Sequence, residues 1–468
     1  MALPCRLGKR RPERLEAAAM PRPPLEALLS TGELPPGPVP PGLLPVAGRA
    51  LIERQARQVA RAGAARILVL APALPEAVER RLTAIPGVAL VEAADGLADQ
   101  LKTAPADSSL LVIEPGALID DRLLEAVRDA PGPAALAVAR VGVAEGAERL
   151  DREAFFAGVL KLAPAAAGGV LAEHPGWEPV STLMRAAAPA ATQVIVEQLP
   201  TYAERNRRKV PILWAYPATS GTGPAEKAII DAAQKGCLDW PARFLHPPVE
   251  NLLVRWLWPT PITPNMVTLA TGVLGLAAMV FLALGQFWPG LALILAIGPL
   301  DGVDGKLART RIEFSKYGDL EHVLDKILEY SWFLAMGWWF WSTGHGLAAW
   351  LVAGGICLFA ILEAIQGEYF RRFAGRQLDD WGPFERRFRL VAGRRNTFFW
   401  ALIPFGLAGA WWLGFVVLLA YAGLTFVIAE WRFLKALAEY ARAHSPNVRE
   451  NFDRTTYGFL PGAGPGSS

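Results

Sequence analysis

Beginning near residue 265, apolar segments long enough to cross a lipid bilayer follow one another along the chain. Their length and hydropathy predict an all-α transmembrane domain of six helices. The predicted spans cover residues 266–287, 289–309, 320–343, 346–368, 397–411 and 412–433. The second segment is apolar only through Leu300, so we expect its last turns to project beyond the hydrocarbon.

The first half of the chain has the character of a soluble α/β domain. A helix-like stretch at 50–63 leads into the apolar run 65–72, and further strand-like runs lie at 109–116 and 134–143. Strands that alternate with helices predict a parallel sheet. We expect a poorly ordered N-terminal segment (1–38), the α/β domain (39–224), amphipathic juxtamembrane helices (225–262), the six-span domain (263–435) and a C-terminal tail (436–468).

The distribution of basic residues predicts the orientation in the membrane. Lysines and arginines are concentrated between the second and third spans and between the fourth and fifth. The positive-inside rule therefore places these loops, both termini and the soluble domain in the cytoplasm, and we expect the inner membrane of a prokaryote. Three scattered cysteines and an N-terminus without a signal-peptide core agree with a reducing compartment. A net charge of +3 without a basic stripe argues against nucleic acid as a partner.

Four carboxylates border one short connection between two predicted spans. Asp301 and Asp304 are three residues apart, and Glu321 and Asp325 are four apart, so each pair shares one helix face. Antiparallel helices would bring all four to one depth, where acidic groups usually mark a functional site. Four such carboxylates need positive charge, and oxygen ligands favour two divalent cations, Mg²⁺ or Mn²⁺. A two-metal site of this kind is suited to displacement at phosphorus.

The residues beside the carboxylates suit a phosphate or nucleotide ligand. Gly305 and Ala308 keep the helix surface small, so a ligand can approach the backbone closely. Arg309 adds a planar, permanently charged donor for a phosphate.

The sequence D-x-x-D-G-x-x-A-R that begins at Asp301, followed by Gly318 and two acids four apart, resembles the signature of the CDP-alcohol phosphotransferases. The likeness extends over residues 225–435. The usual spacing would put the last two carboxylates at His322 and Lys326. We infer that one residue is deleted after Gly318, which restores the pattern with Glu321 and Asp325; a glutamate then replaces the usual third aspartate.

The resemblance implies a reaction and a role for each residue. An acceptor hydroxyl attacks the β-phosphorus of a CDP-alcohol and CMP is released. The four carboxylates would hold the metals, and Asp325 would also be the general base. Gly305, Ala308 and Arg309 would contact the CDP moiety. Members of the family are commonly homodimers, and we carry that expectation over together with contact to membrane lipids.

Arginines crowd the connection before the fifth predicted span. Arg394 and Arg395 stand directly before that span, where they are placed to bind a phosphate on the acceptor. Positive-inside charge and contact with lipid headgroups explain the same residues without a role in the reaction. The sequence leaves both interpretations open.

The stretch LLPVAGRALIERQARQVARAGAARILVL at residues 43–70 resembles part of the sugar nucleotidyltransferases. The Gly-rich loop that should precede it is absent, and Glu114-Pro115-Gly116 stands where a metal-binding aspartate is expected. We therefore expect a degenerate domain without catalytic activity. The fusion is similar to bifunctional proteins that make CDP-inositol and then di-inositol phosphate phosphate.

Three hypotheses follow for the whole chain. The first is a phosphotransferase that uses CDP-diacylglycerol or a CDP-polyol as donor and a hydroxyl acceptor, with inositol phosphate as one candidate. The second is a bifunctional cytidylyltransferase and phosphotransferase of the CDP-inositol type. The third is a membrane scaffold in which both domains are inactive.

Overall fold

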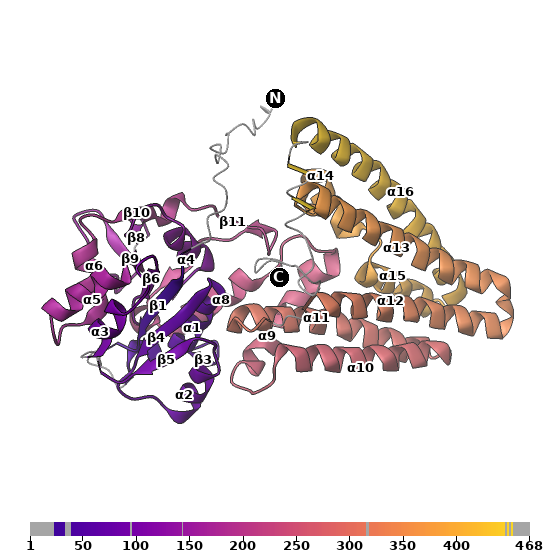
Figure 1. Cartoon of the computed structure of the whole chain (residues 1–468). Helices are drawn as coiled ribbons and strands as arrows, with labels where there is room; N and C mark the ends of the chain where they lie inside the picture. Colours follow the sequence, from indigo (N-terminus) through magenta and orange to yellow (C-terminus); the bar gives the residue numbers. More distant parts are fainter. Residues whose placement is uncertain are drawn as a thin grey trace. The chain divides into compact units, whose positions relative to one another are not determined.

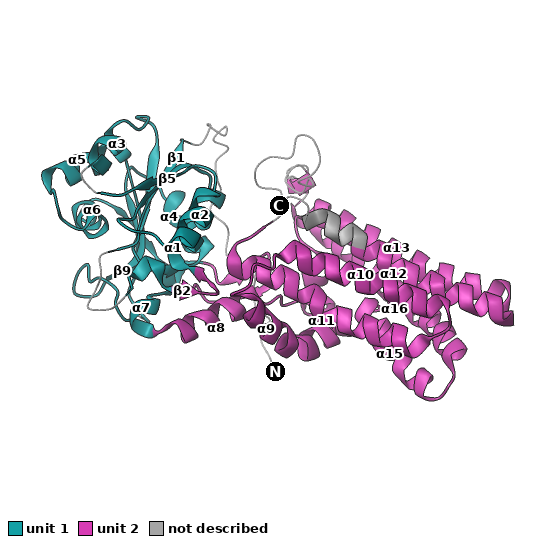
Figure 2. Ribbon diagram, turned by 90° about the horizontal axis from the view of Figure 1, so that it is seen from below, with its two compact units in different colours: residues 1–44, 50–199, 214–220 teal, residues 45–49, 200–213, 221–468 magenta. Residues whose placement is uncertain are grey.

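The computed structural model describes residues 23–32, 39–93, 96–142, 144–314, 318–444, 447–448 and 451–452, with side chains left undescribed at 318–324. The chain forms two compact units (Figure 2). Unit 1 contains residues 1–44, 50–199 and 214–220, and unit 2 contains 45–49, 200–213 and 221–468. Two short segments, 45–49 and 200–213, therefore belong to unit 2, and all residues from 221 onward belong to it as well.

Unit 1 is built on one large sheet, which contains seven strands within the described residues. Their order is β10–β8–β9–β6–β1–β4–β5, and all neighbours pair in parallel except β9, which is antiparallel to β6 and β8. The strands are β1 (Leu25–Ser30), β4 (Ala64–Leu70), β5 (Val88–Val91), β6 (Ser109–Ile113), β8 (Ala135–Ala139), β9 (Phe155–Leu162) and β10 (Thr192–Ile195). The predicted α/β architecture is confirmed, with one strand reversed.

Helices cover both faces of this sheet (Figure 2). One face packs its leucines and valines against α3, α5 and α6, and α1 and α4 contact strands of the same sheet from the other side. The helices are α1 (Leu51–Arg61), α2 (Glu76–Thr83), α3 (Leu97–Lys102), α4 (Asp121–Arg128), α5 (Pro164–Glu173), α6 (Pro179–Ala187) and α7 (Pro217–Ser220). One pair of two-residue strands completes the unit: β7 (Leu118–Ile119) pairs with β13 (Trp214–Ala215). A second short pair, β2 (Pro45–Val46) and β3 (Arg49–Ala50), lies at the segment 45–49 that belongs to unit 2.

Strand β1 corrects the expectation of a poorly ordered segment at 1–38. Residues Leu25–Ser30 pair in parallel with both β4 and β6, and every one of them is buried. Proline- and arginine-rich flanks hide this short strand, because its order depends on non-local pairing and burial that local sequence does not report. Residues 1–22 and 33–38 lie outside the described part of the chain.

Unit 2 begins with short elements that precede the long helices (Figure 1). These are the hairpin strands β11 (Tyr202–Ala203) and β12 (Arg208–Lys209), helix α8 (Thr222–Ala233) and helix α9 (His246–Leu257). The long helices are α10 (Pro264–Ala283), α11 (Phe287–Arg311), α12 (Gly318–Phe340), α13 (Leu347–Ala374), α15 (Arg395–Leu407) and α16 (Trp411–His444), with α14 (Pro383–Val391) between α13 and α15. Each predicted span thus coincides with a helix, and the last helix continues beyond the predicted end at residue 433.

Three of the described helices are long and apolar enough to cross a membrane: α10, α13 and α16. The count of six spans stays a prediction. The helices pack around a shared apolar core rich in aromatic rings, in which Phe333 stacks on Phe399 and Trp332 meets the same ring edge-on. Such pairs add directional packing to the burial of large apolar surfaces.

The end of α11 is tied to the residues after α9 by a buried arginine. Arg311 is 2% exposed, and its guanidinium donates hydrogen bonds to the main-chain oxygens of Ile262 at 2.7 Å, Trp258 at 2.9 Å and Thr260 at 3.0 Å. These bonds satisfy carbonyl groups that the end of α9 leaves without helical partners. They fix the turn that carries Asp301 and Arg309 relative to α9.

Candidate functional site

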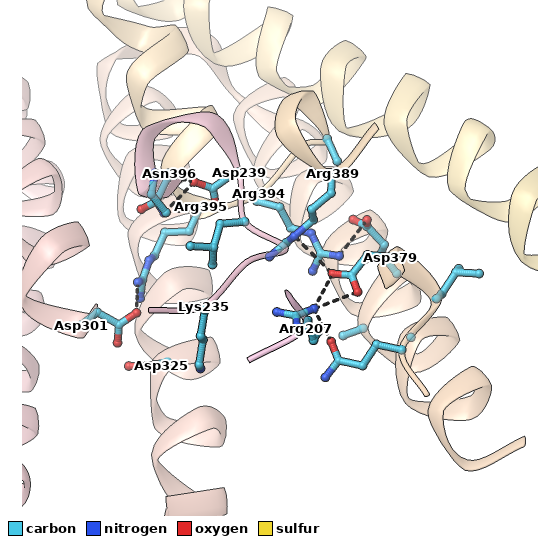
Figure 3. A pocket seen from close by; sticks show the side chains of 18 of the residues that line it. Arg207, Lys235, Asp239, Asp301, Asp325, Asp379, Arg389, Arg394, Arg395 and Asn396 are labelled. Carbon is cyan, nitrogen blue, oxygen red and sulfur yellow. Dashed lines mark hydrogen bonds and ion pairs between the residues drawn. The ribbon is translucent and has the colours of Figure 1, made fainter. Parts of the chain in front are cut away.

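A cavity of about 970 Å³ lies within unit 2, beside the C-terminal turns of α11 that carry Asp301. Its walls come from α9, from α11 to α16, from the chain between α8 and α9, and from the turn of the β11–β12 hairpin. Figure 3 shows side chains of the residues that line it. The lining is strongly charged: nine acidic side chains and ten lysines or arginines face it. A polar cavity of this size accommodates a substrate with phosphate groups.

Two of the predicted carboxylates meet at this cavity. Asp301 on α11 and Asp325 on α12 both line it, and their carboxyl groups are close enough to share a hydrogen bond. Arg395, the first residue of α15, forms an ion pair with Asp301 (Figure 3). Two carboxyl groups in contact repel when both are ionised, so this pair requires nearby positive charge.

The other two predicted metal ligands are placed differently. Asp304 is buried, and its Oδ2 accepts a hydrogen bond from Thr268 Oγ1 at 2.8 Å, which points this carboxylate toward α10. Glu321 lies among residues 318–324, whose side chains are outside the described set. Within the described residues, no three acidic, histidine or cysteine side chains are grouped closely enough to hold a metal.

The chemistry of the donors nevertheless fits a hard divalent cation. Asp301, Asp304 and Asp325 offer only oxygen ligands, and the two that face the cavity come from separate helices. Asp304 lies one helical turn beyond Asp301 and is near enough to Asp325 to affect it electrostatically. Glu321 precedes Asp325 by one turn on the same helix. The backbone thus places all four positions at one end of the α11–α12 pair.

The register of α12 decides which residues complete the carboxylate cluster. Lys326, which stands where the usual spacing requires a carboxylate, directs its ammonium to Glu329 Oε2 at 2.7 Å. Asp325 is the side chain that reaches Asp301. His322 falls among the undescribed side chains. This geometry agrees with a shift of one residue, and the catalytic role of Asp325 remains a prediction.

The residues expected to contact the CDP moiety lie along the same turns of α11. Arg309 lines the cavity, and its Nε donates a hydrogen bond to Ala233 O at 2.8 Å. A Cβ added to Gly305 would come within 3.1 Å of Arg309 Nη1, so the glycine lets that guanidinium lie close to the helix backbone. Ala308 is partly exposed on the same helix. Their contact with a nucleotide stays a prediction.

Both arginines predicted to bind the acceptor line the cavity. Arg395 faces Asp301, whereas Arg394 Nη2 lies 3.3 Å from Glu363 on α13. The sequence pattern gives no role to Glu363, and in the structure this residue is the counter-charge of Arg394. The two consecutive arginines therefore serve different parts of the cavity.

Sequence reasoning missed the residues that lie before the first long helix. Lys235, Asp239 and Arg207 all line the cavity, although their segments read as soluble domain or interfacial helix. Asp239 accepts hydrogen bonds from Asn396 Nδ2 at 3.1 and 3.2 Å, which anchors this segment to the start of α15. The sequence shows these residues only as polar positions in segments before the first span. Such positions do not by themselves predict contact with residues that are distant in the sequence.

Lys235 and Asp379 have pKa values that depart from those of free side chains. Burial lowers the pKa of Lys235 to about 8, and the nearby guanidinium groups of Arg309 and Arg207 act in the same direction. Burial opposes ionisation of Asp379, but Arg389 and Arg207 outweigh it, so the pKa of Asp379 lies below its ordinary value. Asp301 and Asp304 act in the opposite direction on Lys235, so burial is the main reason for its low pKa.

Unit 1 has its own buried carboxyl at Glu114, the position that stands in place of the expected aspartate. Tyr216 Oη donates a hydrogen bond to its Oε2. Burial raises the pKa of Glu114 to about 8, against the effect of that hydrogen bond. A carboxyl with this pKa is largely protonated at neutral pH, which suits it poorly to hold a metal.

We expect Glu114→Gln to stabilise the protein in alkaline solution. The folded chain holds the Glu114 proton more tightly than the unfolded chain, so the free energy of unfolding falls as pH rises from about 4.5 to about 8. Glutamine stays neutral and escapes this loss, which amounts to on the order of 5 kcal/mol. Thermal unfolding of the full-length variant in detergent should show a higher Tm than the parent at pH 9 and an equal Tm at pH 5. An equal Tm at both values would contradict the burial of a neutral carboxyl.

Comparisons with known proteins identify the class. Residues 261–392 match the model of the CDP-alcohol phosphatidyltransferase family. The chain is 34% identical over 158 residues to inner membrane protein YnjF of Escherichia coli, covering 32% of this chain and 73% of that protein. The chain therefore belongs to the CDP-alcohol phosphatidyltransferase family, and it is a CDP-alcohol phosphotransferase. Members of this family generally use divalent metal ions, a CDP-alcohol donor and a hydroxyl acceptor.

A bifunctional enzyme and two solved structures show weaker similarity to the chain. The chain is 26% identical over 211 residues to a bifunctional IPC transferase and DIPP synthase of Aquifex aeolicus, which is 44% of this chain and 46% of that protein. An inositol-1-phosphate CTP transferase from T. maritima superposes at a TM-score of 0.31 with 10% identity, over 43% of this chain and 94% of its own. A 4-diphosphocytidyl-2C-methyl-D-erythritol synthase from Anaerococcus prevotii gives 0.26 with 10% identity, over 37% and 89%.

Proposed function

We propose that this membrane protein transfers the phosphoalcohol group of a CDP-alcohol to a hydroxyl acceptor at the Asp301–Asp325 site and releases CMP. The convergence of these two carboxyl groups, from separate helices, on the wall of a large charged cavity carries the proposal. Asp301, Asp304, Glu321 and Asp325 would hold two divalent cations, Mg²⁺ or Mn²⁺. Such cations, when bound, stabilise the attacking and leaving oxygens in displacement at phosphorus.

Asp325 is the general base in this proposal. It accepts the proton of the acceptor hydroxyl as that oxygen forms its bond to the β-phosphorus, and the bond from this phosphorus to the oxygen of CMP breaks. Asp301 and Arg395 lie beside Asp325 and hold it at the cavity wall. Gly305, Ala308 and Arg309 line the approach of the CDP moiety along α11.

The cationic part of the cavity favours an acceptor that carries negative charge. Arg394 and Arg395 reach the cavity from the start of α15, and Arg389 lines it from α14. A polar alcohol with a phosphate group, such as inositol phosphate, satisfies this requirement. CDP-diacylglycerol and a CDP-polyol remain the two candidate donors.

Unit 1 is proposed to be a retained nucleotidyltransferase-like domain without catalytic activity. The high pKa of Glu114 supports this proposal. The likeness to the bifunctional protein of Aquifex aeolicus supports the alternative, in which unit 1 makes a CDP-alcohol that unit 2 consumes. We further propose a homodimer, embedded in membrane lipids of the inner membrane, with the cavity on the cytoplasmic side.

A panel of donors tests the proposed function. Purified protein in detergent, supplied with Mg²⁺, is incubated with CDP-diacylglycerol or CDP-inositol and with inositol phosphate, and CMP and the new phosphodiester are measured. We expect CMP and product in equal amounts with one donor. Formation of the CDP-alcohol from CTP and inositol phosphate would favour the bifunctional alternative. If the folded protein released no CMP from any CDP-alcohol, the result would contradict the proposed function and favour an inactive membrane scaffold.

A further inference from the structure

Two cations in the cavity come from chain segments that precede the family-matched residues 261–392: Arg207 and Lys235. Arg207 lies in the turn between β11 and β12, and Lys235 follows α8. The segment 200–213 leaves unit 1, joins unit 2 and is followed by a return to unit 1 at residues 214–220. The cavity is therefore completed by parts of this chain that the shared family region does not contain.

Arg207 is held firmly in the cavity wall. Its Nη1 lies 2.8 and 2.9 Å from the two carboxylate oxygens of Asp379 and 2.6 Å from Gln377 Oε1. Its backbone has a φ of 53°, the left-handed conformation that costs a side-chain-bearing residue about 1 kcal/mol or more. Surrounding contacts must maintain this conformation, and the bonds of the guanidinium to Asp379 and Gln377 are among them.

Lys235 has a different environment. Within the described part of the chain its ammonium makes neither a hydrogen bond nor an ion pair with another side chain, although it faces the cavity. Figure 3 places it between Asp325 and Arg207. A lysine that is partly buried, close to other cations and unpaired is costly unless a ligand supplies an anion.

The positive charge around Lys235 is only partly balanced. Asp379 is shared by Arg207 and by Arg389, whose Nε lies 3.3 Å from Asp379 Oδ2. Arg394 lies near enough to Arg389 to repel it. Asp379 thus pairs with two guanidinium groups, and Asp239 adds a more distant negative charge near Arg389.

We propose that Lys235 and Arg207 form a subsite for the phosphate monoester of the acceptor alcohol and thereby determine acceptor specificity. A phosphate monoester carries nearly two negative charges and three acceptor oxygens, and it would supply the missing partner of Lys235 and a second partner for Arg207. The CDP diphosphate is the other possible source of phosphate oxygens. The proposed function places that group along Gly305 and Arg309 of α11, which leaves Lys235 and Arg207 to the acceptor.

This inference rests on the proposed function, and kinetics test the two together. With saturating donor, Lys235→Gln and Arg207→Lys should raise the KM for inositol phosphate about ten-fold or more, because charge-assisted or bidentate bonds are lost. We expect the KM for the CDP-alcohol and the kcat to change less than about three-fold. Lys209→Ala is the matched control, since Lys209 is exposed on the same hairpin and does not line the cavity.

Binding of inorganic phosphate provides a readout that does not depend on turnover. Phosphate should raise the Tm of the parent protein and of Lys209→Ala, and raise that of Lys235→Gln much less. Lys235 bonds to no other described side chain and its buried charge is costly, so its replacement should not lower the Tm without phosphate. A rise in the donor KM alone, or phosphate stabilisation that is equal in all variants, would overturn the subsite. Absence of CMP release from the parent would instead refute the proposed function, while phosphate binding would still decide the subsite.

Discussion

Replacement of Asp325 by Asn is expected to lower the rate of CMP release by at least about a thousand-fold. Asparagine keeps the shape of the side chain but neither accepts a proton at neutral pH nor offers an anionic oxygen to a cation. The position of Asp325 against Asp301 makes this the most damaging single change in the cavity. The measurement is the initial rate of CMP release with the donor that the parent protein uses.

Glu368→Gln serves as the control for that experiment. Glu368 lines the same cavity, but its carboxylate is paired with Arg371 and Arg372 at 2.9 and 2.8 Å. We expect this variant to keep its activity within a few-fold of the parent, because the carboxylate is already occupied by these arginines and does not contact Asp301 or Asp325. Asp325→Asn with parental activity and an unchanged Tm would show that the reaction uses another base.

The largest effect on stability is expected from Lys306→Ala. Lys306 is 1% exposed, and its Nζ lies 2.7 Å from Glu250 Oε2 and 2.8 Å from Asn251 Oδ1 on α9. Gly302 allows Glu250 to approach α11, because a Cβ at that position would collide with its carboxylate. Removal of the lysine leaves a buried carboxylate without its partner and should cost about 3–5 kcal/mol. Thermal unfolding in detergent measures the loss.

A double replacement separates the ion pair from the packing of the two helices. In Lys306→Met with Glu250→Gln no charge remains buried, so the double variant should recover most of the stability that Lys306→Ala loses. Arg80→Ala, which breaks an exposed pair with Glu76, should leave the Tm unchanged. If Lys306→Ala behaves like Arg80→Ala, the pair does not hold α9 against α11.

Much of the helical part of the fold follows from the sequence, because long apolar segments and their boundaries are local signals. Thr263 caps α10 by accepting a hydrogen bond from Met266 N at 3.3 Å, and Pro264 begins the helix. In unit 1, β6 falls within the predicted apolar run 109–116, and β4 overlaps the run 65–72. Strand β1 was missed because its position between β4 and β6 depends on contacts that are distant in sequence.

Part of the site could also be predicted from local signals in the sequence. The spacing of Asp301 and Asp325 on consecutive helices is enough to predict that both face one cavity, because the helix period and a short connection define their positions. The spacing does not reveal that Asp304 turns to Thr268, since that hydrogen bond depends on the neighbouring helix α10. Arg207 and Lys235 reach the cavity through segments whose sequence carries no periodic pattern that predicts such a contact.

The divalent-cation dependence of CMP release tests the central claim most directly. Purified protein, freed of metal by chelation, is assayed with its CDP-alcohol donor and acceptor over a range of Mg²⁺ and Mn²⁺ concentrations, alongside Asp301→Asn. The account predicts no CMP without a divalent cation, full restoration on its addition, and a marked rise in the cation concentration that Asp301→Asn requires. CMP release that persists without metal, or an identical cation requirement in Asp301→Asn, would contradict a metal-dependent carboxylate site at α11 and α12.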